Sequence, residues 1–499
     1  MTQGIEVTTN AVSKKKKMKH KSIFLPFLFL LIISCSGEKS YQLPAIAHIN
    51  NEISSGNFTE ASKLIKIRLM SDTLPEIERW NLNFELEKMD RIRYDFRASD
   101  SSVISYIKRY YPNVTKSEIE HWEQTNALEN MIIDGKKCYF RSAARNLFRI
   151  DSIAAKHFVA AEGQAGDSLT RFLAKHIPQL ISERQNVNGT YFKPVTMNVK
   201  YTLSVKPNEV PDGEIVRVWM PYPRGDVRSQ SNIRLISTSQ PDFLISPDKY
   251  LHKSIYMEKK AVKDSATIFS YNLEYTCYSQ HFNFDPNNIK PYNIEDSIYK
   301  KYTSEIPPHI VFSNKIKDTV AKIVGSETNP YKKIKLIYEW IDSNFPWASA
   351  REYSTIENIP EYVLANRHGD CGQVSLLLIT MARCAGVPAK WQSGWMMHPG
   401  NLNLHDWAEI YYDGIGWVPV DQSFGRVKSA LGNDEVYYFY TKGIDAYRMI
   451  VNQDISAPLF PAKIYPRSET VDFQRGEVEW KGGNLYFDRW NYDMEVKYH

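Results

Sequence analysis

The chain has 499 residues, enough for about two to four domains that each bury a core of their own. Its hydrophobic content of 43% and its charged content of 24% are those of an ordinary globular protein. The formal net charge of +5 comes from residues 1–34, which carry six lysines and one acidic residue, so the remaining chain is neutral. The body of the protein therefore lacks the basic bias of a nucleic-acid-binding protein, and we expect no nucleic-acid partner.

The cysteines are few and widely spaced. They are Cys35, Cys138, Cys277, Cys371 and Cys384. No Cys-x-x-Cys pair occurs among them, so the sequence indicates neither a zinc knuckle nor a redox pair. His368 and His398 have no accompanying ligand set. We therefore expect no metal site and no cofactor, and we interpret Cys138, Cys277 and Cys384 as core residues.

The N-terminus has the pattern of an export signal. The basic run Lys14–Lys21 precedes the apolar run Ile23–Ile33, which is too short to span a bilayer because spanning needs about 20 residues. This combination is typical of a secretory signal, predicted here over residues 1–34 with a possible true start at Met18. The Ser-Cys-Ser-Gly at its end resembles a bacterial lipobox and implies cleavage before Cys35 and lipidation of its thiol. An ordinary signal peptide with an incidental cysteine is the alternative. We expect an exported, membrane-anchored lipoprotein, on the periplasmic face or at the cell surface.

Changes in the hydrophobic period divide the body into four regions. Residues 35–187 show helical spacing and form a helical accessory region, with a clear helix start at Asp72–Ile77. Residues 188–285 alternate apolar and polar side chains, which predicts an antiparallel β-sandwich. Residues 286–435 contain helices and strands and hold the candidate chemistry. Residues 436–499 are again strand-like and form a β-rich extension.

Cys371 lies at the predicted start of a helix. The residues after it keep a helical apolar spacing from Val374 to Ala385, and Gly386-Val387-Pro388 ends the helix. A thiol at a helix N-terminus feels the positive end of the helix dipole, so we expect Cys371 to have a low pKa. Backbone N–H groups at the same end can hold a developing oxyanion. Cys371 is therefore the candidate nucleophile.

His405 and Asp421 are predicted on two successive antiparallel strands. The chain between them contains Tyr412-Asp413-Gly414, which is typical of a short hairpin loop. If Tyr411 pairs with Ile415, His405 lies directly opposite Asp421, with both side chains on one face and their Cβ atoms about 5 Å apart. A thiol, an imidazole and a carboxylate can supply a nucleophile, its base and the group that orients the base.

Each of these residues alone is more often a packing, surface or turn residue, but their combination is specific. The Gly-Asp-Cys of 369–371, the His-x-Trp-x-Glu of 405–409 and the Gly-Trp-Val-x-Val-Asp of 416–421 resemble the motifs of the transglutaminase-like superfamily. The resemblance covers about residues 310–425 and implies a papain-like core. The expected fold class is α+β, with this core preceded by the β-sandwich and by an N-terminal all-helical region.

The resemblance also implies roles, with Cys371 as nucleophile, His405 as base and Asp421 as the residue that orients the base. We expect hydrolysis of amide bonds in a peptide, protein or glycopeptide substrate of the cell envelope, through a thioester on the cysteine. The alternatives are an amine-incorporating protein cross-linker and a catalytically silent binding or scaffold protein on the same fold.

Several nearby residues have two possible roles. Trp347 and Tyr353 are candidates for a second oxyanion donor by residue type alone. For Asp406 and Glu409 we favour a structural role over a substrate-facing one. Three tryptophans either wall a substrate cleft or fill the core: Trp391, Trp395 and Trp407.

Overall fold

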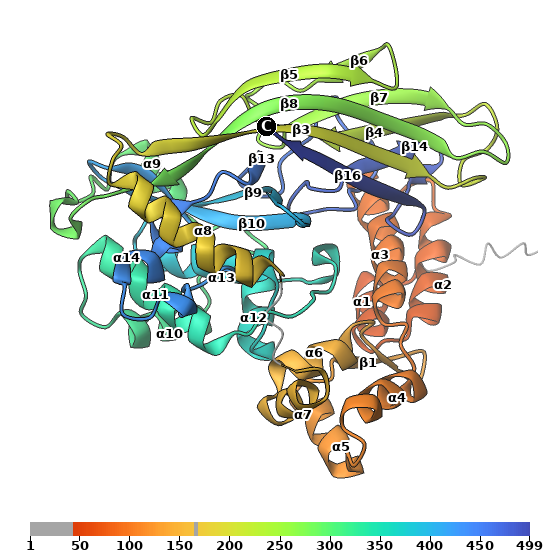
Figure 1. Cartoon of the computed structure of the whole chain (residues 1–499). Coiled ribbons are helices and arrows are strands. Elements are labelled where there is room, and N and C mark those ends of the chain that lie inside the picture. The colour runs from red at the N-terminus through yellow and green to blue at the C-terminus, as the bar shows by residue number, and fades with distance from the viewer. Residues whose placement is uncertain (1–42, 164–167) are drawn as a thin grey trace, which may run out of the picture. The chain divides into compact units, whose positions relative to one another are not determined.

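The N-terminal part of the described chain is mainly helical, as predicted (Figure 1). The computed structural model describes residues 43–163 and 168–499, so the predicted signal peptide and Cys35 lie outside the described residues. The helices of this part are α1 (Ile46–Ser54), α2 (Phe58–Leu69), α3 (Glu76–Asp95), α4 (Asp100–Tyr110), α5 (Lys116–Gln124), α6 (Ala143–Ile150), α7 (Ser152–Glu162) and α8 (Ser168–Arg184).

The prediction of an all-helical region is wrong at one point. Strand β1 (Asn130–Ile133) pairs with β2 (Lys136–Tyr139) in a two-stranded hairpin. Its turn is formed by Asp134 and Gly135, which have φ angles of 48° and 76°. An Asp-Gly pair with two positive φ angles is the preferred sequence for a tight hairpin turn, so a short local signal interrupts the helical pattern.

The local sequence explains where several helices begin. Helix α3 starts at Glu76, directly after Pro75 and within the predicted start at Asp72–Ile77. Helices α4 and α5 begin after Ser99 and Thr115, and each of these residues forms a reciprocal capping box with the residue three positions later. Such caps satisfy backbone N–H groups that have no partner within the helix.

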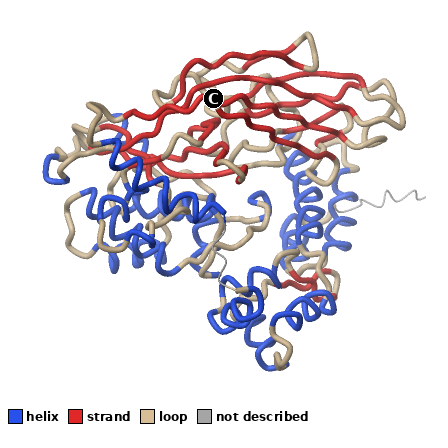
Figure 2. The backbone as a smooth tube through the Cα atoms, in the orientation of Figure 1, coloured by secondary structure: helices blue, strands red, loops and turns tan. Residues whose placement is uncertain are grey.

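Two five-stranded antiparallel sheets follow and bury a common apolar core between them (Figure 2). The first has the order β12-β8-β3-β16, with β5 also paired to β8, and the second has the order β15-β14-β4-β7-β6. Their strands are β3 (Tyr191–Val205), β4 (Ile215–Pro221), β5 (Gln230–Thr238), β6 (Phe243–Ile245), β7 (Ser254–Lys260), β8 (Thr267–His281), β12 (Gly443–Ile444), β14 (Glu477–Trp480), β15 (Gly483–Asn484) and β16 (Trp490–Tyr498). The predicted alternation is present in β3, where Met197, Val199 and Tyr201 are buried.

A third sheet carries the candidate site. Its order is β11-β10-β9-β13, and its strands are β9 (Ala389–His398), β10 (Asn401–Tyr412), β11 (Gly416–Val420) and β13 (Arg448–Gln453). The helices of this part are α9 (Ser297–Tyr302), α10 (Asn314–Val324), α11 (Pro330–Asn344), α12 (Ile359–Asn366), α13 (Cys371–Cys384) and α14 (Asp434–Tyr437). Helix α13 is buried along most of its length and packs on α11, α12, β9 and β10, which fixes its start relative to the sheet.

The C-terminal segment supplies strands to all three large sheets. Strand β13 pairs with β9, β14 with β4, and β16 with β3 along its whole length. Side chains of β9 and β13, among them Trp395 and Met449, belong to the same apolar core as those of the sandwich. Residues from Pro44 to His499 consequently form one compact unit, and the mixture of helices with antiparallel sheets is α+β, as predicted.

Within residues 43–163 and 168–499, no helix combines the length and the apolar composition that a membrane crossing requires.

Candidate active site

Cys371 is the first residue of helix α13, as predicted. Just before it, the Asp370 carboxylate accepts a hydrogen bond from the Gln373 backbone N–H at 3.0 Å. The Gln373 side chain in turn accepts a hydrogen bond from the Asp370 backbone N–H at 3.3 Å. This reciprocal cap fixes the start of the helix and holds the half-buried Cys371 side chain at its N-terminal end.

Gly372 allows the chain to pass between two side chains of the site. A Cβ atom at this position would lie 2.2 Å from the Tyr353 hydroxyl oxygen and 2.8 Å from a carboxylate oxygen of Asp406. The Tyr353 hydroxyl donates a hydrogen bond of 2.6 Å to Asp370, so its oxygen is held in place by that bond. Only glycine fits here without moving the residues around Cys371.

His405 and Asp421 are in direct contact. Nε2 of His405 lies 2.8 Å from Oδ2 of Asp421, and both side chains are buried. His405 lies within β10 and Asp421 directly follows β11, so the sheet supplies both residues. The three side chains predicted to act together thus lie on two neighbouring parts of the core. Cys371 is on α13, and His405 and Asp421 are on the β10–β11 hairpin and at its end.

The register of this hairpin differs from the prediction. Tyr411 pairs with Trp417, not with Ile415. The three-residue loop begins one residue later than predicted and has Gly414 at φ 82° inside it, while the next pairing residue is Gly416 at φ 104°. His405 and Asp421 are therefore diagonal neighbours instead of directly opposed ones. The partner of Tyr411 is shifted by two residues from the predicted one, which is an even number. The side chains of His405 and Asp421 therefore stay on one face of the sheet, as predicted.

A buried arginine, Arg448, stabilises the negative charge of Asp421, and this residue is not predicted from the sequence. Nη2 of Arg448 lies 3.1 Å from Oδ2 of Asp421, the same oxygen that contacts His405. Burial alone would raise the pKa of Asp421, but its interactions with His405 and with the charge of Arg448 outweigh this effect, and the pKa is lowered. Asp421 is therefore an ionised acceptor.

His405 is neutral in this environment. Burial lowers its pKa, against the opposing effect of Asp421. Because Nε2 faces an ionised carboxylate, it carries the imidazole proton and donates it, which leaves Nδ1 as a proton acceptor. The ring is fixed between Phe424, at a centroid distance of 4.8 Å, and Trp407, at 5.9 Å. This is the protonation state that a general base requires.

The prediction that Cys371 has a low pKa is wrong for the side chain as it lies here. Burial raises the pKa of the thiol, and the carboxyl groups of Asp406 and Asp370 raise it further. Sγ of Cys371 lies 3.3 Å from Oδ2 of Asp406. The sequence indicated the helix N-terminus but not that carboxylates surround it, so the resting pair is a thiol and a neutral imidazole.

Cys371 lies where two cavities meet. The larger cavity has a volume of about 720 Å³ and contains both Cys371 and His405 in its lining. The smaller one, of about 210 Å³, contains Cys371 but not His405. Both are lined by Trp347, Cys371, Asn403 and Leu404.

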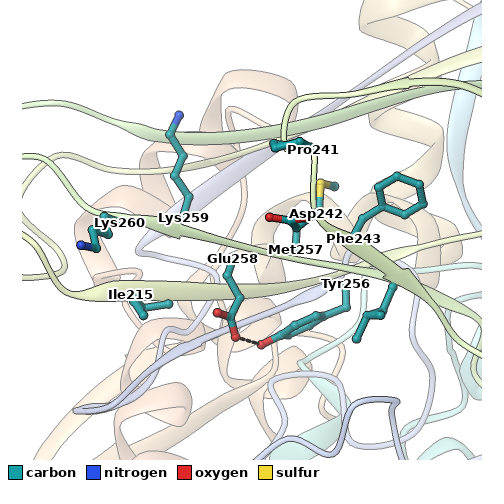
Figure 3. A pocket seen from close by; sticks show the side chains of 10 residues that line it. Ile215, Pro241, Asp242, Phe243, Tyr256, Met257, Glu258, Lys259 and Lys260 are labelled. Atoms are coloured by element: carbon teal, nitrogen blue, oxygen red, sulfur yellow. Dashed lines mark hydrogen bonds between the residues drawn. The ribbon is translucent and has the colours of Figure 1, made fainter.

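A further cavity, of about 560 Å³, lies away from this site at strands β4, β6 and β7 (Figure 3). It contains no cysteine or histidine among its lining residues. The Tyr256 hydroxyl donates a hydrogen bond to Glu258 there. Because neither a thiol nor an imidazole lines this cavity, we place the candidate chemistry at Cys371.

Gln474 is a second residue that the sequence did not indicate. Its side-chain N–H group donates to the backbone carbonyl of His405 at 2.8 Å and to Oδ1 of Asp406 at 2.7 Å. It comes from the C-terminal segment, in the loop before β14. No motif marks it, because its role depends on a contact between residues 68 positions apart.

The residues with two possible roles fall into two groups, those that line a cavity and those that do not. Glu409 is structural, since it pairs with Lys390 at 3.0 Å and accepts from Gln392. Asp406 lines the smaller cavity beside Cys371, so the preference for a purely structural role is wrong for this residue. Trp347 is 45% exposed and lines both cavities. The tryptophans that either wall a cleft or fill the core are fully buried and line none of these cavities: Trp391, Trp395 and Trp407.

The remaining cysteines pack in apolar cores. Cys277 is buried in the sandwich core, Cys138 packs on the core of the N-terminal helices, and Cys384 packs on the core around α13. None of the four cysteines in the described part of the chain forms a disulfide. Among the same residues, no group of three His, Cys, Asp or Glu side chains is arranged to hold a metal ion.

The helical region contributes to the walls of the site. Arg149 of α6 lines the larger cavity and lies over the Trp347 ring at 4.6 Å from its centroid. Asn146, also in α6, exchanges two hydrogen bonds of 2.9 Å with the backbone of Ser349. Helix α8 adds Leu169 and Leu173 to the same cavity.

Together, the fold and the site define an α+β protein of the papain-like kind, with a cysteine at a helix start beside a His-Asp hairpin. A profile of the transglutaminase-like superfamily matches residues 317–422, the part that holds α13 and this hairpin. The chain therefore carries a domain of the transglutaminase-like superfamily.

Two curated relatives match part of the chain. An uncharacterized protein of Haemophilus influenzae is 26% identical over 240 residues, which are 41% of this chain and 63% of that protein. The uncharacterized protein YebA of Bacillus subtilis is 21% identical over 156 residues, 28% of this chain and 21% of that protein. The chain thus spans less than two thirds of the length of either relative.

Solved structures give low-scoring matches. A candidate cysteine protease from Cytophaga hutchinsonii is matched with a TM-score of 0.43 and 14% identity, over 62% of this chain and 92% of that one. The periplasmic domain of TgpA from Pseudomonas aeruginosa is matched with a TM-score of 0.25 and 11% identity, over 50% of this chain and 97% of that one.

Proposed function

We propose that this protein is a cysteine hydrolase that cleaves amide bonds in peptides, proteins or glycopeptides of the cell envelope. The observation that supports this most is the 2.8 Å contact between His405 and Asp421 within reach of the cavity that Cys371 also lines. It supplies a neutral base with a fixed tautomer in the cavity that the thiol also lines.

The first half of the reaction forms a thioester. Nδ1 of His405 takes the thiol proton as Sγ of Cys371 bonds to the carbonyl carbon of the substrate. The negative charge on the carbonyl oxygen is stabilised by backbone N–H groups at the start of α13. When the C–N bond breaks, the imidazolium returns the proton to the nitrogen, and an amine or ammonia leaves.

The second half releases the acyl group. His405 takes a proton from a water molecule, whose oxygen bonds to the thioester carbon. The C–S bond then breaks, Cys371 recovers the proton, and a carboxylic acid leaves. Asp421 keeps the imidazole oriented and balances its charge while it is protonated, and Arg448 keeps Asp421 ionised.

The test is a comparison of the wild-type protein with Cys371→Ala on libraries of peptides and glycopeptides, read by mass spectrometry. Hydrolysis predicts products that together exceed the substrate by one water, and no products with the variant. A labelled primary amine is added in parallel. Amine incorporated in place of water would mean the cross-linking alternative, and no product of either kind would favour a silent binding protein.

We also propose that the chain is exported and anchored through a lipid on Cys35, based on the sequence of residues 1–34. One acyl chain binds a membrane weakly, so a stable anchor needs more than one. Metabolic labelling with palmitate tests this directly. Label on the wild-type protein that is absent from Cys35→Ala is the expected result, and unlabelled wild-type protein would contradict the proposal.

A further inference from the structure

The smaller cavity beside Cys371 has an unusual balance of charged side chains. Five acidic and three basic residues are part of its lining: Glu352, Asp370, Asp406, Glu469 and Asp472, and Arg141, Arg351 and Arg475. The cavity measures about 210 Å³, room for a small group and not for a large side chain. What it can bind depends on which of these charges are already paired.

All three arginines are engaged by carboxylates. Arg475 forms a two-bonded pair with Glu352, at 2.8 Å and 3.1 Å, and its Nε donates to Glu469 at 2.8 Å. Arg141 lies 3.5 Å from the same Glu352. Arg351 faces away, to Glu129 at 3.5 Å. The cations of the lining are therefore balanced by Glu352, Glu469 and an acid outside the cavity.

Three carboxyl groups of the lining form no ion pair with a described residue: Asp370, Asp406 and Asp472. Asp370 accepts from the Tyr353 hydroxyl and from a backbone N–H group. Asp406 accepts from the Gln474 side chain and contacts the Cys371 thiol. Both have neutral partners only.

Of the three carboxyl groups, that of Asp472 is the one without any bonding partner among the described residues. Only 6% of its surface is exposed, and its carboxyl group makes no hydrogen bond or ion pair with any described residue. A buried carboxylate without a partner is costly, typically by several kcal/mol. In the free protein, burial and the nearby Glu469 raise the pKa of Asp472, and the charges of Arg475 and Arg467 oppose this effect.

These features fit a small cation with several N–H donors. A primary ammonium group carries one positive charge and three donors, and three carboxyl groups of the cavity lining form no ion pair with a described residue. A metal ion needs closely grouped oxygen ligands, and no such group occurs among the described residues. We propose that the smaller cavity binds a primary ammonium group of the substrate, next to the carbonyl group that Cys371 attacks.

This inference rests on the proposed function, because it assigns the cavity to the same substrate. Asp406 touches both the cavity and Sγ of Cys371, so the ammonium group would lie on the residue at, or next to, the scissile bond. The group has two possible sources, the free α-amino end of a peptide and an amino side chain. Both present the same chemistry to the cavity, and substrates that block one or the other distinguish them.

The first experiment measures binding without requiring hydrolysis. Glycinamide is the cationic probe and N-acetylglycinamide is its neutral match, and both are followed by ligand-observed NMR with the full-length protein. The variants are Asp472→Asn, which keeps the shape of the side chain, and Asp406→Asn. The matched control is Asp242→Asn in the separate cavity of Figure 3. Thermal unfolding of each variant checks that it is folded.

We expect glycinamide to bind to the wild-type protein and to Asp242→Asn, with affinity about 10- to 100-fold lower for Asp472→Asn, as for the loss of a charge-assisted hydrogen bond. Equal binding of the two probes would overturn the inference. So would unchanged glycinamide binding in both cavity variants. Magnesium chloride is tested alone, and displacement of glycinamide by magnesium at similar concentrations would point to a metal site instead.

The second experiment uses the best-cleaved peptide in three forms: free, N-acetylated, and N-acetylated with a lysine as its first residue. If the α-amino group is recognised, the KM of the N-acetylated peptide that lacks the lysine should be about tenfold or more above the KM of the free peptide. Recovery by the lysine form would assign an amino side chain. Equal, Cys371-dependent cleavage of all three forms would overturn the inference and leave the hydrolase intact. Cleavage of none would reject the hydrolase, and the binding result would still decide the cavity.

Discussion

Arg448 and His405 share one carboxylate oxygen of Asp421, at 3.1 Å and 2.8 Å. All three side chains are at most 4% exposed. Arg448 comes from β13, on the far side of β9 from the hairpin that carries the other two residues. A strand contributed by the C-terminal segment therefore supplies the charge that keeps Asp421 ionised.

Replacing Arg448 tests this dependence. Arg448→Met leaves Asp421 buried with neutral His405 beside it and without the charge of Arg448, so the pKa of Asp421 should rise and the activity should fall by about tenfold or more. The acidic limb of the rate profile should move to higher pH. The matched control is Arg489→Met, whose partner Glu209 is on the surface of the sandwich. An unchanged pH profile in Arg448→Met would contradict the assigned role.

Substitutions of Asp421 should separate orientation from charge. Asp421→Ala removes the acceptor for Nε2 of His405, and we expect kcat to fall by about 10³- to 10⁴-fold. Asp421→Asn keeps an oxygen that can accept the same hydrogen bond and should retain more activity than the alanine variant. Steady-state kinetics of both proteins provides the comparison. Equal losses would mean that the charge alone matters.

The thiol of Cys371 should titrate above its ordinary range in the free protein. Burial and the carboxyl groups of Asp406 and Asp370 raise its pKa, so alkylation by iodoacetamide should be slow at neutral pH and accelerate only in alkaline solution. Asp406→Asn removes a negative charge that opposes the thiolate, so the labelling curve should move to lower pH. Peptide mapping identifies the labelled residue. A wild-type curve centred well below the ordinary thiol range would contradict this account.

The sequence was sufficient for those features that depend on local patterns. The start of α13 follows from a Gly-Asp-Cys-Gly stretch and the apolar spacing after it, and the alternation in β3 follows from period two. The same-face placement of His405 and Asp421 depends only on the parity of their spacing, so it survived an error in the predicted pairing.

Features that depend on contacts between distant segments were not predictable. Arg448, Gln474 and Asp472 come from the C-terminal segment, and no spacing relates them to Cys371. The expected low pKa of the thiol failed for the same reason. The helix N-terminus is a local property, whereas the carboxyl group of Asp406 reaches Sγ only through the packing of β10 on α13.

Asp95 links the helical region to the loop between α11 and α12. It is fully buried at the end of α3, accepts from the Glu352 backbone N–H at 2.9 Å and lies 3.6 Å from Arg141. Burial and the charge of Glu352 raise its pKa to about 6.

A carboxyl group whose pKa is raised on folding stabilises the folded protein below its unfolded pKa of about 4, and this stability is lost as pH rises through about 6. Asp95→Asn should remove this part of the pH dependence, at most about 3 kcal/mol, since one unit of pKa corresponds to about 1.4 kcal/mol. Urea unfolding at pH 4, 5, 6 and 7 measures it. If the free energy of unfolding changes with pH equally in the variant and in the wild type, Asp95 titrates normally.

Residues of the N-terminal helices line part of the larger cavity, and Arg149 is the residue through which to test whether these helices bind the substrate. The guanidinium group of Arg149 lies over Trp347, in the lining of the cavity that also contains His405. It contacts none of the three proposed catalytic side chains in the described structure, so it should affect binding more than chemistry. Arg149→Ala should raise KM by about 3- to 10-fold and change kcat by less than about twofold.

A matched control is available on the same helix. Arg145 precedes Arg149 by four residues, is likewise exposed and lines none of the cavities described above. Arg145→Ala should leave both kinetic constants unchanged, since exposed substitutions away from a site have small effects. Equal changes in KM for the two variants would indicate a general electrostatic effect of the helical region. A fall in kcat without a change in KM for Arg149→Ala would instead mean that Arg149 acts on the reacting groups, because a binding contact made equally in the ground and transition states alters KM alone.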